Sequence, residues 1–412
     1  MGSYTLRCLG CGREVDRFAM NCPCGNALLR THYADRQLTL LPLPGIWRFL
    51  SWLPVGSPLP GTDGGPITYR SEGLASALGL EELWITFSGY WPERDALLPT
   101  CSFKELESLP TTQRLLERGR EDILVVASAG NTARAFAYTS SLCGQPLVLC
   151  VPRSALPKLW LPGREPLNTC TVAVDGDYFD AIRLGEALAS RPGFVPEGGA
   201  RNVARRDGMA TVMLDAVMTS GRLPDRYFQA VGSGTGGISA YEASLRLIAD
   251  GRFGSSLPRL HLVQNSPCSP LITLRTGKPY APSCPQGMFD AVLFNRSPPY
   301  GVTGGVADAL EASSGTLSEV SNERASEAAR LFLSTEGVDI LPAAAVAVAG
   351  LTEAIERGEV KAGERVLLNI TGGGESLSRR ELGTVPIRPD LMVGPEADAD
   401  ELIDRTREVL GI

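Results

Sequence analysis

Short apolar segments alternate with helical segments over most of this chain. The apolar segments have the length of strands, and they lie at residues 122–127, 146–151, 169–174, 227–231, 260–264 and 365–370. Residues 122–127 form an apolar run typical of a buried strand. Helical patterns lie between and after them, at residues 179–189, 209–219, 238–249, 322–335 and 343–357. Strands that alternate with helices predict an α/β fold with parallel sheets. Ligands of such sheets bind at the carboxyl ends of the strands, so we expect function in the turns at those ends.

The 412 residues are enough for two domains and a small appendage. We expect a small cysteine-rich ribbon at residues 1–34, a large α/β domain at residues 35–99 and 206–412, and a smaller α/β domain at residues 100–205 that closes on the substrate. Residues 265–305 are dense in Pro, Ser and Gly, which predicts a long loop of functional or lid type.

Composition and charge exclude several classes of function. The formal net charge is -7 without an obvious basic patch, so we expect no nucleic-acid partner. No apolar run reaches the ~18 residues of a membrane-spanning helix, and the beginning of the sequence lacks the apolar core of a signal peptide. We therefore expect a cytoplasmic protein whose scattered cysteines stay reduced, acting on small molecules, and we expect a homo-oligomer.

Four of the ten cysteines cluster in the first 24 residues. Cys8 and Cys11 form one pair and Cys22 and Cys24 form another, and a glycine follows the second cysteine of each pair. The spacing C-x2-C-x10-C-x-C could supply four thiolates to a structural zinc ion. The second pair is one residue tighter than the usual C-x2-C, so a metal-free ribbon that has kept its cysteines stays an alternative.

A single lysine, Lys104, follows a proline-marked loop and begins a helical segment. The positive field of a helix N-terminus, together with desolvation, lowers the pKa of an amine, and such an amine is suited to forming a Schiff base. Taken alone, a surface lysine on an amphipathic helix is the simpler interpretation. The pair Pro110-Thr111 further along this helix predicts a kink or a restart.

A glycine-rich turn, Gly232-Ser-Gly-Thr-Gly-Gly237, joins a strand to a helix. Its N–H groups can converge on a phosphate, which the helix dipole also favours. The spacing fits neither a Walker A loop nor the dinucleotide fingerprint, so a small terminal phosphate is the better fit. A glycine-rich turn without a ligand is the alternative.

Two other turns at strand ends carry polar side chains. The turn Ser128-Ala-Gly-Asn-Thr132 places an amide and two hydroxyls at a helix N-terminus, where they suit a carboxylate or a phenolic oxygen, although plain helix capping is the alternative. The hydroxyl of Thr371, before three glycines, could hydrogen-bond a ring nitrogen, although an ordinary loop is the alternative.

The succession S-F-K, S-A-G-N-T, G-S-G-T-G-G and T-G-G-G resembles fold-type II pyridoxal-phosphate (PLP) enzymes, the tryptophan synthase β-like group. The N-terminal cysteines and a Trp-Arg-Phe segment before Pro54 are similar to the threonine synthase branch. The resemblance implies two doubly wound α/β domains. It also implies that Lys104 holds PLP as a Schiff base and later acts as acid and base, and that Asn131 bonds the 3'-oxygen of the ring.

The resemblance implies further roles. The phosphate of PLP would be bound by Gly232, Ser233, Gly234, Thr235, Gly236 and Gly237. Thr371 would face the pyridine nitrogen, and its neutral hydroxyl would leave the ring unprotonated, which favours elimination and replacement over transamination. The substrate carboxylate would be bound by Ser128, Ala129, Gly130 and Thr132.

The residues after Lys104 depart from threonine synthases, which usually carry S-F-K-D-R-G. Here the sequence is S-F-K-E-L-E, and with T-G-G-G-E-S it resembles the cysteate synthase family of archaeal coenzyme M biosynthesis. That family converts O-phospho-L-serine and sulfite to L-cysteate and phosphate through an aminoacrylate intermediate. Two anions must be bound in turn, and the candidate cations, unranked by sequence, are Arg134, Arg153, Arg205 and Arg206.

Three alternatives remain open from the sequence. A threonine synthase would act on O-phospho-L-homoserine and water, and a cysteine synthase would use sulfide. A ligand-binding relative without catalysis would be expected to have lost the lysine, whereas Lys104 is present.

Overall fold

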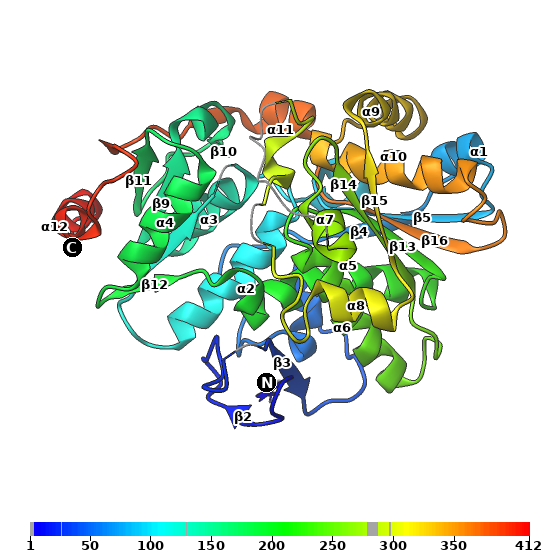
Figure 1. Ribbon diagram of the computed structural model, residues 1–412, viewed down its shortest axis with the longest axis horizontal. Coiled ribbons are helices and arrows are strands. Elements are labelled where there is room, and N and C mark those ends of the chain that lie inside the picture. The colour runs from blue at the N-terminus through cyan, green and yellow to red at the C-terminus, as the bar shows by residue number, and fades with distance from the viewer. Residues whose placement is uncertain (1–3, 26, 129, 278–286, 296–297) are drawn as a thin grey trace.

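The computed structural model describes residues 4–25, 27–128, 130–277, 287–295 and 298–412. It has two lobes, each built on a sheet, and a small N-terminal ribbon (Figure 1). This arrangement confirms the predicted α/β class with a cysteine-rich ribbon. No helix among the described residues is long and apolar enough to cross a membrane. Assembly into a homo-oligomer and a cytoplasmic location stay predictions.

The large lobe contains a six-stranded sheet in the order β15-β14-β13-β16-β5-β4. Its strands are β4 (Ile67–Arg70), β5 (Glu82–Phe87), β13 (Arg226–Ala230), β14 (Arg259–Asn265), β15 (Thr316–Val320) and β16 (Arg365–Ile370). All neighbouring strands are parallel except β4 and β5, so the sheet needs helices on both faces.

Helices cover both faces of this sheet. One face packs on α1 (Gly73–Leu78), α9 (Asn322–Glu336) and α10 (Pro342–Glu356), and the other on α2 (Lys104–Glu117), α5 (Val203–Ser220), α6 (Thr235–Asp250) and α8 (Val306–Ala312). The side chains of β13 alternate accordingly. Tyr227 belongs to the core under α5 and α6, whereas Phe228 belongs to the core under α10.

The small lobe contains a five-stranded parallel sheet in the order β12-β8-β9-β11-β18. Its strands are β8 (Ile123–Ala127), β9 (Leu147–Pro152), β11 (Thr169–Val174), β12 (Phe194–Pro196) and β18 (Leu391–Val393). Its helices are α3 (Asn131–Cys143) on one face and α4 (Tyr178–Ala189) with α12 (Ala399–Leu410) on the other.

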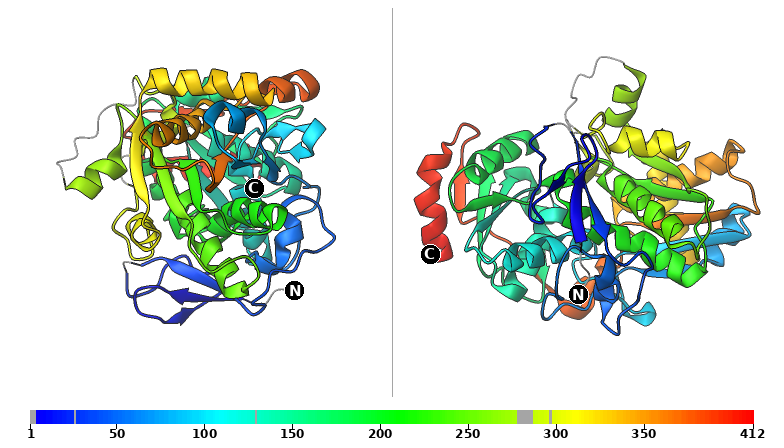
Figure 2. Two further views of the ribbon diagram at one scale, coloured as in Figure 1. Left: turned by 90° about the vertical axis from the view of Figure 1, so that its right-hand side faces the viewer. Right: turned by 90° about the horizontal axis from the view of Figure 1, so that it is seen from below.

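The last part of the chain returns to the small lobe, which differs from the predicted extent of the large domain, residues 206–412. Helix α11 (Glu375–Leu382) is followed by β17 (Thr384–Pro386), which pairs with β10 (Trp160–Pro162), and β18 then pairs with β11. Leu391 and Val393 of β18 pack in the same apolar core as Val172 and Val174 of β11, which stabilises this pairing at the edge of the sheet. Helix α12 lies at the outer side of this lobe (Figure 2).

The predicted long loop at residues 265–305 also differs in part from the structure. A short helix, α7 (Pro270–Thr276), forms within it, because Pro270 stands at a first helical position where its missing N–H costs nothing. Short strands that the sequence left unassigned, β6 (Tyr90–Trp91) and β7 (Ala96–Leu97), pair with each other.

The N-terminal ribbon consists of β1 (Tyr4–Cys8), β2 (Glu14–Val15) and β3 (Leu29–Tyr33). Buried polar bonds fasten it to the large lobe. The hydroxyls of Thr31 and Tyr33 donate to Asp207 Oδ2 on α5 at 2.6 and 2.7 Å, and Arg30 pairs with Glu242 on α6 at 3.1 Å. The ribbon lies below the lobes in Figure 1, and seen from below it crosses in front of the middle of the molecule (Figure 2).

Helix α2 continues through Pro110, so the predicted restart is wrong, whereas the predicted kink stays a prediction. A proline cannot donate to the carbonyl of the residue four positions earlier, which is Leu106. That carbonyl lies against Gly208 of α5, where a methyl group would be only 2.0 Å from the oxygen. Glycine at this crossing lets the two helices pack closely.

We expect Gly208→Ala to lower the free energy of unfolding by about 1–3 kcal/mol, because the added methyl group collides with backbone that cannot move aside. An unconstrained Gly→Ala change in a helix would instead stabilise by about 1 kcal/mol, so the sign is diagnostic. Urea denaturation measures the difference. Gly394→Ala, where a methyl group meets nothing within 4 Å, is the control and should change stability by less than about 0.5 kcal/mol.

Candidate active site

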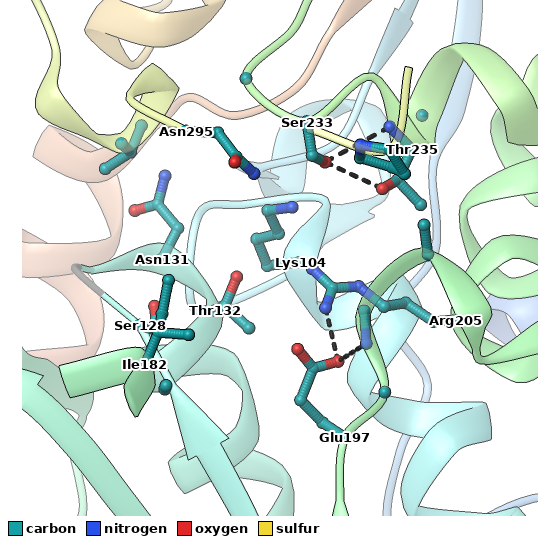
Figure 3. A pocket seen from close by; sticks show the side chains of 18 of the residues that line it. Lys104, Ser128, Asn131, Thr132, Ile182, Glu197, Arg205, Ser233, Thr235 and Asn295 are labelled. Carbon is teal, nitrogen blue, oxygen red and sulfur yellow. Dashed lines mark hydrogen bonds and ion pairs between the residues drawn. The ribbon is translucent and has the colours of Figure 1, made fainter. Parts of the chain in front are cut away.

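A cavity of about 680 Å³ lies between the two lobes, within the range of small-molecule sites. Both sheets contribute to it through turns at the carboxyl ends of their strands, as expected for parallel sheets. The sequence-predicted residues that line it are Lys104, Ser128, Gly130, Asn131, Thr132, Gly232, Ser233, Gly234, Thr235, Gly236 and Thr371. Figure 3 shows Lys104 among them, with Asn131, Asn295 and Ser233 around its amine end.

The loop that presents Lys104 is fixed to the glycine-rich loop after β16. The N–H of Phe103 donates to Thr371 O at 3.0 Å, and the N–H of Gly373 donates to Cys101 O at 3.1 Å. Cys101 takes a left-handed backbone conformation with φ of 58°, which is costly for a residue other than glycine. These contacts fix where α2 begins, and therefore where its first side chain points.

The buried carboxyl group of Glu105 braces the same loop. It accepts hydrogen bonds from the N–H and the hydroxyl of Thr100 at 3.2 and 2.6 Å. Burial raises the pKa of Glu105 to about 7, although the bonds from Thr100 oppose the rise. Glu105, the first glutamate of the S-F-K-E-L-E segment, therefore stabilises the loop that precedes Lys104.

The amine of Lys104 lies 3.5 Å from Glu107 Oε2 and 4.7 Å from the centre of the Phe103 ring. Burial lowers the pKa of Lys104, the Glu107 carboxylate opposes this, and the Arg205 guanidinium lowers the pKa further. The net direction is downward, as the sequence analysis expected. A larger fraction of the amine is therefore neutral, which is the form that attacks a carbonyl carbon.

Glu107 also joins a buried ion-pair network that sequence reasoning missed. Its carboxylate accepts from Arg205 Nε at 2.9 Å, and Arg205 Nη1 reaches Glu197 at 2.5 Å. Glu107 is fully buried and the Arg205 side chain is 9% exposed. The only sequence signal for this network is Glu107 itself, which departs from the usual S-F-K-D-R-G. Arg205 lies 98 residues further along the chain, so no local motif joins the two residues.

The four arginines that the sequence left unranked occupy different surroundings. Arg205 lines the cavity. Arg134 is buried against the Trp160 ring, 4.3 Å from its centre, and Arg206 is buried beside Glu242 at 3.0 Å. Arg153 is 59% exposed and lies 3.8 Å from Asp175. Arg134, Arg153 and Arg206 are not among the cavity-lining residues.

The turn before α3 combines capping with open polar groups. Ser128 Oγ accepts hydrogen bonds from the N–H groups of Gly130 and Ala133 at 3.2 and 3.1 Å. Ser128 therefore caps the N-terminus of α3, which was the alternative interpretation of this turn. Asn131 Oδ1 accepts from Arg134 at 3.2 Å, which leaves the amide NH2 to donate into the cavity.

Two further members of this turn were predicted to bind substrate. The hydroxyl of Thr132 lies 3.4 Å from Glu107 Oε1, at the outer edge of hydrogen-bonding distance. Ala129 lies outside the described residues.

The glycine loop before α6 is shaped by close contacts. A methyl group on Gly236 would lie 2.1 Å from Gln229 Nε2, and one on Gly234, whose φ is 81°, would lie 2.5 Å from Val306. Gly237 packs against Leu262 and is not among the cavity-lining residues. The first N–H groups of α6 have no partner inside the helix, so this end of the cavity offers donors and partial positive charge to an anion.

The hydroxyls of the loop add to these donors. Ser233 Oγ and Thr235 Oγ1 lie 2.8 Å apart, on the cavity side of the loop (Figure 3). Across the cavity Thr371, which is 6% exposed, lines the wall. The three glycines after Thr371 permit close backbone approach, since a methyl group on Gly374 would lie 1.7 Å from Tyr90 O.

Sequence reasoning missed several other lining residues. The 265–305 segment contributes Asn295 and Pro299, which fits its prediction as a functional loop. The N-terminal module contributes Met20 and Asn21, and the turn after β12 contributes Arg201. No local motif marked them, because the cavity wall forms only when distant segments pack together.

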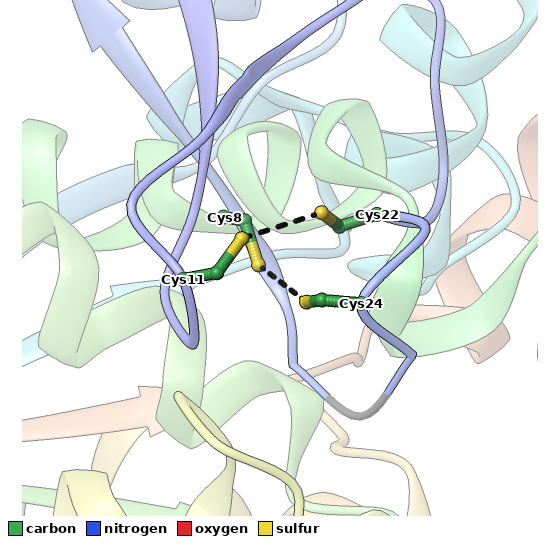
Figure 4. Close-up of side chains that lie close together, drawn as sticks. All are labelled: Cys8, Cys11, Cys22 and Cys24. Carbon is green, nitrogen blue, oxygen red and sulfur yellow. Dashed lines mark hydrogen bonds between the residues drawn. The ribbon is translucent and has the colours of Figure 1, made fainter.

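The four N-terminal cysteines converge outside the cavity (Figure 4). Their sulfur atoms lie within 4.8 Å of one another, with 3.4 Å between Cys8 and Cys24 and 3.6 Å between Cys11 and Cys22. Four sulfurs around a tetrahedral zinc ion would be separated by roughly 3.8 Å, as follows from a Zn–S distance of about 2.3 Å. The cluster therefore has the dimensions of a closed four-thiolate site.

Comparisons with known proteins agree on one family. The model of the pyridoxal-phosphate dependent enzyme family matches residues 68–372. The cysteate synthase of Methanococcoides burtonii is 52% identical over 412 residues, covering 100% of this chain and 99% of that protein. The cysteate synthase of Methanosphaerula palustris is 53% identical over 98% of this chain and 97% of that protein.

Solved structures show the same fold at low identity. Diaminopropionate ammonia lyase from Escherichia coli matches with a TM-score of 0.59 at 16% identity, covering 79% of this chain and 88% of that one. Maize serine racemase matches with a TM-score of 0.58 at 14% identity, covering 75% and 88%.

We expect Glu107→Gln to lower the pKa of Lys104 further, because a neutral amide of the same shape replaces the carboxylate that favours the charged amine. The pH dependence of the reaction of Lys104 with an amine-specific reagent, followed by mass spectrometry in cofactor-free protein, measures this. The midpoint should move to lower pH. Glu186→Gln, which removes a carboxylate from another wall of the cavity, should leave it in place. A midpoint that rises in Glu107→Gln would contradict the expectation.

Proposed function

Because this chain belongs to the cysteate synthase family of PLP-dependent enzymes, we propose that it replaces the phosphate group of O-phospho-L-serine with sulfite. The products are L-cysteate and phosphate. The observation that carries this proposal is a partly buried lysine with a lowered pKa, in one cavity with the glycine loop at the N-terminus of α6, in a chain about half identical to cysteate synthases over its whole length.

The residues of the cavity fit PLP. Lys104 offers the amine that attaches the cofactor, and the loop of Gly232–Gly236 offers N–H groups and two hydroxyls to its phosphate. The NH2 of Asn131 suits the ring oxygen, and the neutral hydroxyl of Thr371 suits an unprotonated ring nitrogen. When bound, PLP supplies an electron sink for negative charge at Cα of an amino acid.

The other groups of the cavity would orient the amino acid. We propose that Gly130, Ser128 and Thr132, with Ala129, bind its carboxylate at the N-terminus of α3, where the helix dipole favours an anion. Among the described residues the oxygen of Ser128 accepts from the helix N-terminus and its O–H donates to none of them, so we propose that the O–H donates to the substrate carboxylate.

The replacement balances without an oxidant or reductant. Lys104 takes the proton from Cα, and the Cβ–O bond breaks with its electron pair leaving on phosphate. The sulfur lone pair of sulfite then forms the Cβ–S bond, and Lys104 returns the proton to Cα. The small lobe would close over the cavity during these steps to exclude water. We also propose that the cysteate formed in this way is used for the biosynthesis of coenzyme M.

Product analysis tests the proposed function. We expect purified protein with PLP, phosphoserine and sulfite to release phosphate and form cysteate in equal amounts. Parallel incubations with O-phospho-L-homoserine, and with phosphoserine plus sulfide, detect threonine synthase and cysteine synthase activity. Threonine or cysteine without cysteate would overturn the proposal.

Lys104→Ala should abolish turnover and the visible absorbance band of the attached cofactor, because no other amine of the described cavity wall can replace it. Removing a nucleophile of this kind lowers rates by roughly 10³-fold or more. Lys158→Ala, at an exposed lysine paired with Asp290, is the control and should keep both. Full turnover by Lys104→Ala would contradict the proposed role.

We also propose that the cysteine cluster holds a structural zinc ion, on the strength of its four converging sulfurs. Elemental analysis of the purified protein should find about one zinc per chain, since one four-thiolate site takes one ion. Cys11→Ser should lower the content, whereas Cys143→Ser, outside the cluster, should not. Protein with full stability and no metal after chelation would overturn the proposal.

A further inference from the structure

The proposed reaction brings two anions into the cavity in turn, so its cations are of interest. Among the described cavity-lining residues the cationic side chains are Lys104, Arg201 and Arg205. Lys104 carries the reaction. Arg205 is already held between the carboxylates of Glu107 and Glu197, which neutralise it.

Arg201 has different surroundings. It ends a short 3-10 turn, Gly199–Arg201, at the C-terminal end of the small-lobe segment that begins at β12. Its guanidinium donates from Nη1 to Asn21 Oδ1 at 2.9 Å. Within the described ranges no carboxylate lies within ion-pair distance of it. Its charge is therefore available to an anion entering the cavity.

Asn21 belongs to the segment between the two cysteine pairs, which we name the cysteine loop (residues 12–21). Helix α2, which begins at Lys104, holds this loop in place through hydrogen bonds. Arg114 of α2, buried, donates to Arg17 O at 2.5 Å and to Ala19 O at 3.3 Å. The sulfur contacts between Cys11 and Cys22 close the loop at its base.

Close packing joins the cysteine loop to the turn that carries Arg201. Gly198, with φ of 87°, approaches Met20 so closely that a methyl group there would lie 2.6 Å from Met20 Sδ. Met20 and Asn21 both line the cavity. The cysteine loop thus forms part of the wall of the active site. Its Asn21 side chain is neutral, so it holds the Arg201 guanidinium without neutralising the positive charge.

We propose that Arg201, positioned by Asn21, is the residue that selects the anionic group of the substrates, the phosphate of phosphoserine and then sulfite. The inference deepens the proposed function and rests on it. A guanidinium presents a planar pair of donors to an oxyanion, which suits both tetrahedral phosphate and pyramidal sulfite. The cysteine module then serves specificity as well as stability.

Inorganic phosphate, one reaction product, is the probe for a test that needs no turnover. Its dissociation constant is measured for PLP-loaded wild type and variants by equilibrium dialysis. Arg201→Gln should weaken phosphate binding about 10-fold or more, as expected for loss of a charge-assisted hydrogen bond. Arg201→Lys should recover part of the affinity, because it keeps the charge and loses the planar donor pair. Arg153→Gln is the control and should stay within about two-fold of wild type.

Steady-state kinetics give the second readout. Arg201→Gln should raise the KM for phosphoserine and for sulfite by a similar factor with a smaller change in kcat, the mark of lost binding. Asn21→Ala should move the same constants in the same direction by about three-fold or more, because the guanidinium loses its fixed orientation. Retained visible absorbance in each variant shows that the PLP site is intact.

Phosphate binding by Arg201→Gln as tight as by wild type would overturn the inference. Loss of PLP affinity with unchanged phosphate binding would overturn it too, since Arg201 would then serve the cofactor. An effect of Arg201→Gln without any effect of Asn21→Ala would refute the positioning by the cysteine loop. If wild type forms no cysteate, the proposed function fails while the phosphate comparison still decides the role of Arg201.

Discussion

The buried ion pair between Glu107 and Arg205 is the constraint on which the active site depends. Two charges taken out of water must be paired, and removing one partner of such a pair costs roughly 3–5 kcal/mol. Glu107 lies beside the Lys104 amine, and its partner Arg205 also forms an ion pair with Glu197 of the small lobe. One set of charges therefore determines the electrostatic surroundings of the Lys104 amine and also joins the two lobes.

Much of the fold could be predicted from sequence because its signals are local. Strands β8, β9, β11, β13, β14 and β16 lie in segments rich in apolar residues, and the helices between them lie near the expected residues, although α5 begins at Val203 rather than at residue 209. The edge strand β18 could not be found in this way, because three residues become a strand only when β11 offers them a partner. The continuity of α2 through Pro110 was missed for a similar reason, since Gly208 of a distant helix packs against the Leu106 carbonyl, to which Pro110 cannot donate.

The residues of the candidate site also fall into those that a local motif marks and those that depend on distant partners. Lys104, Asn131, the glycine loop and Thr371 stand in short motifs at strand ends, and the structure gathers them around one cavity. Arg205, Arg201 and Asn21 have no motif, and their roles depend on partners brought from elsewhere in the chain. Sequence alone could therefore suggest the cofactor chemistry of the site but could not tell which cations line the cavity.

The return of the chain to the small lobe has a mechanical consequence. Helix α12 belongs to the small lobe through β18, whereas β3 is bonded to α5 and α6 of the large lobe, so the proposed closure would change the distance between α12 and β3. The chain also crosses between the lobes three times, near residues 120, 200 and 385, and three connections would restrain twisting of one lobe against the other during the proposed closure. A pair of fluorophores, one on α12 and one on the ribbon, would therefore act as a ruler for that closure in solution.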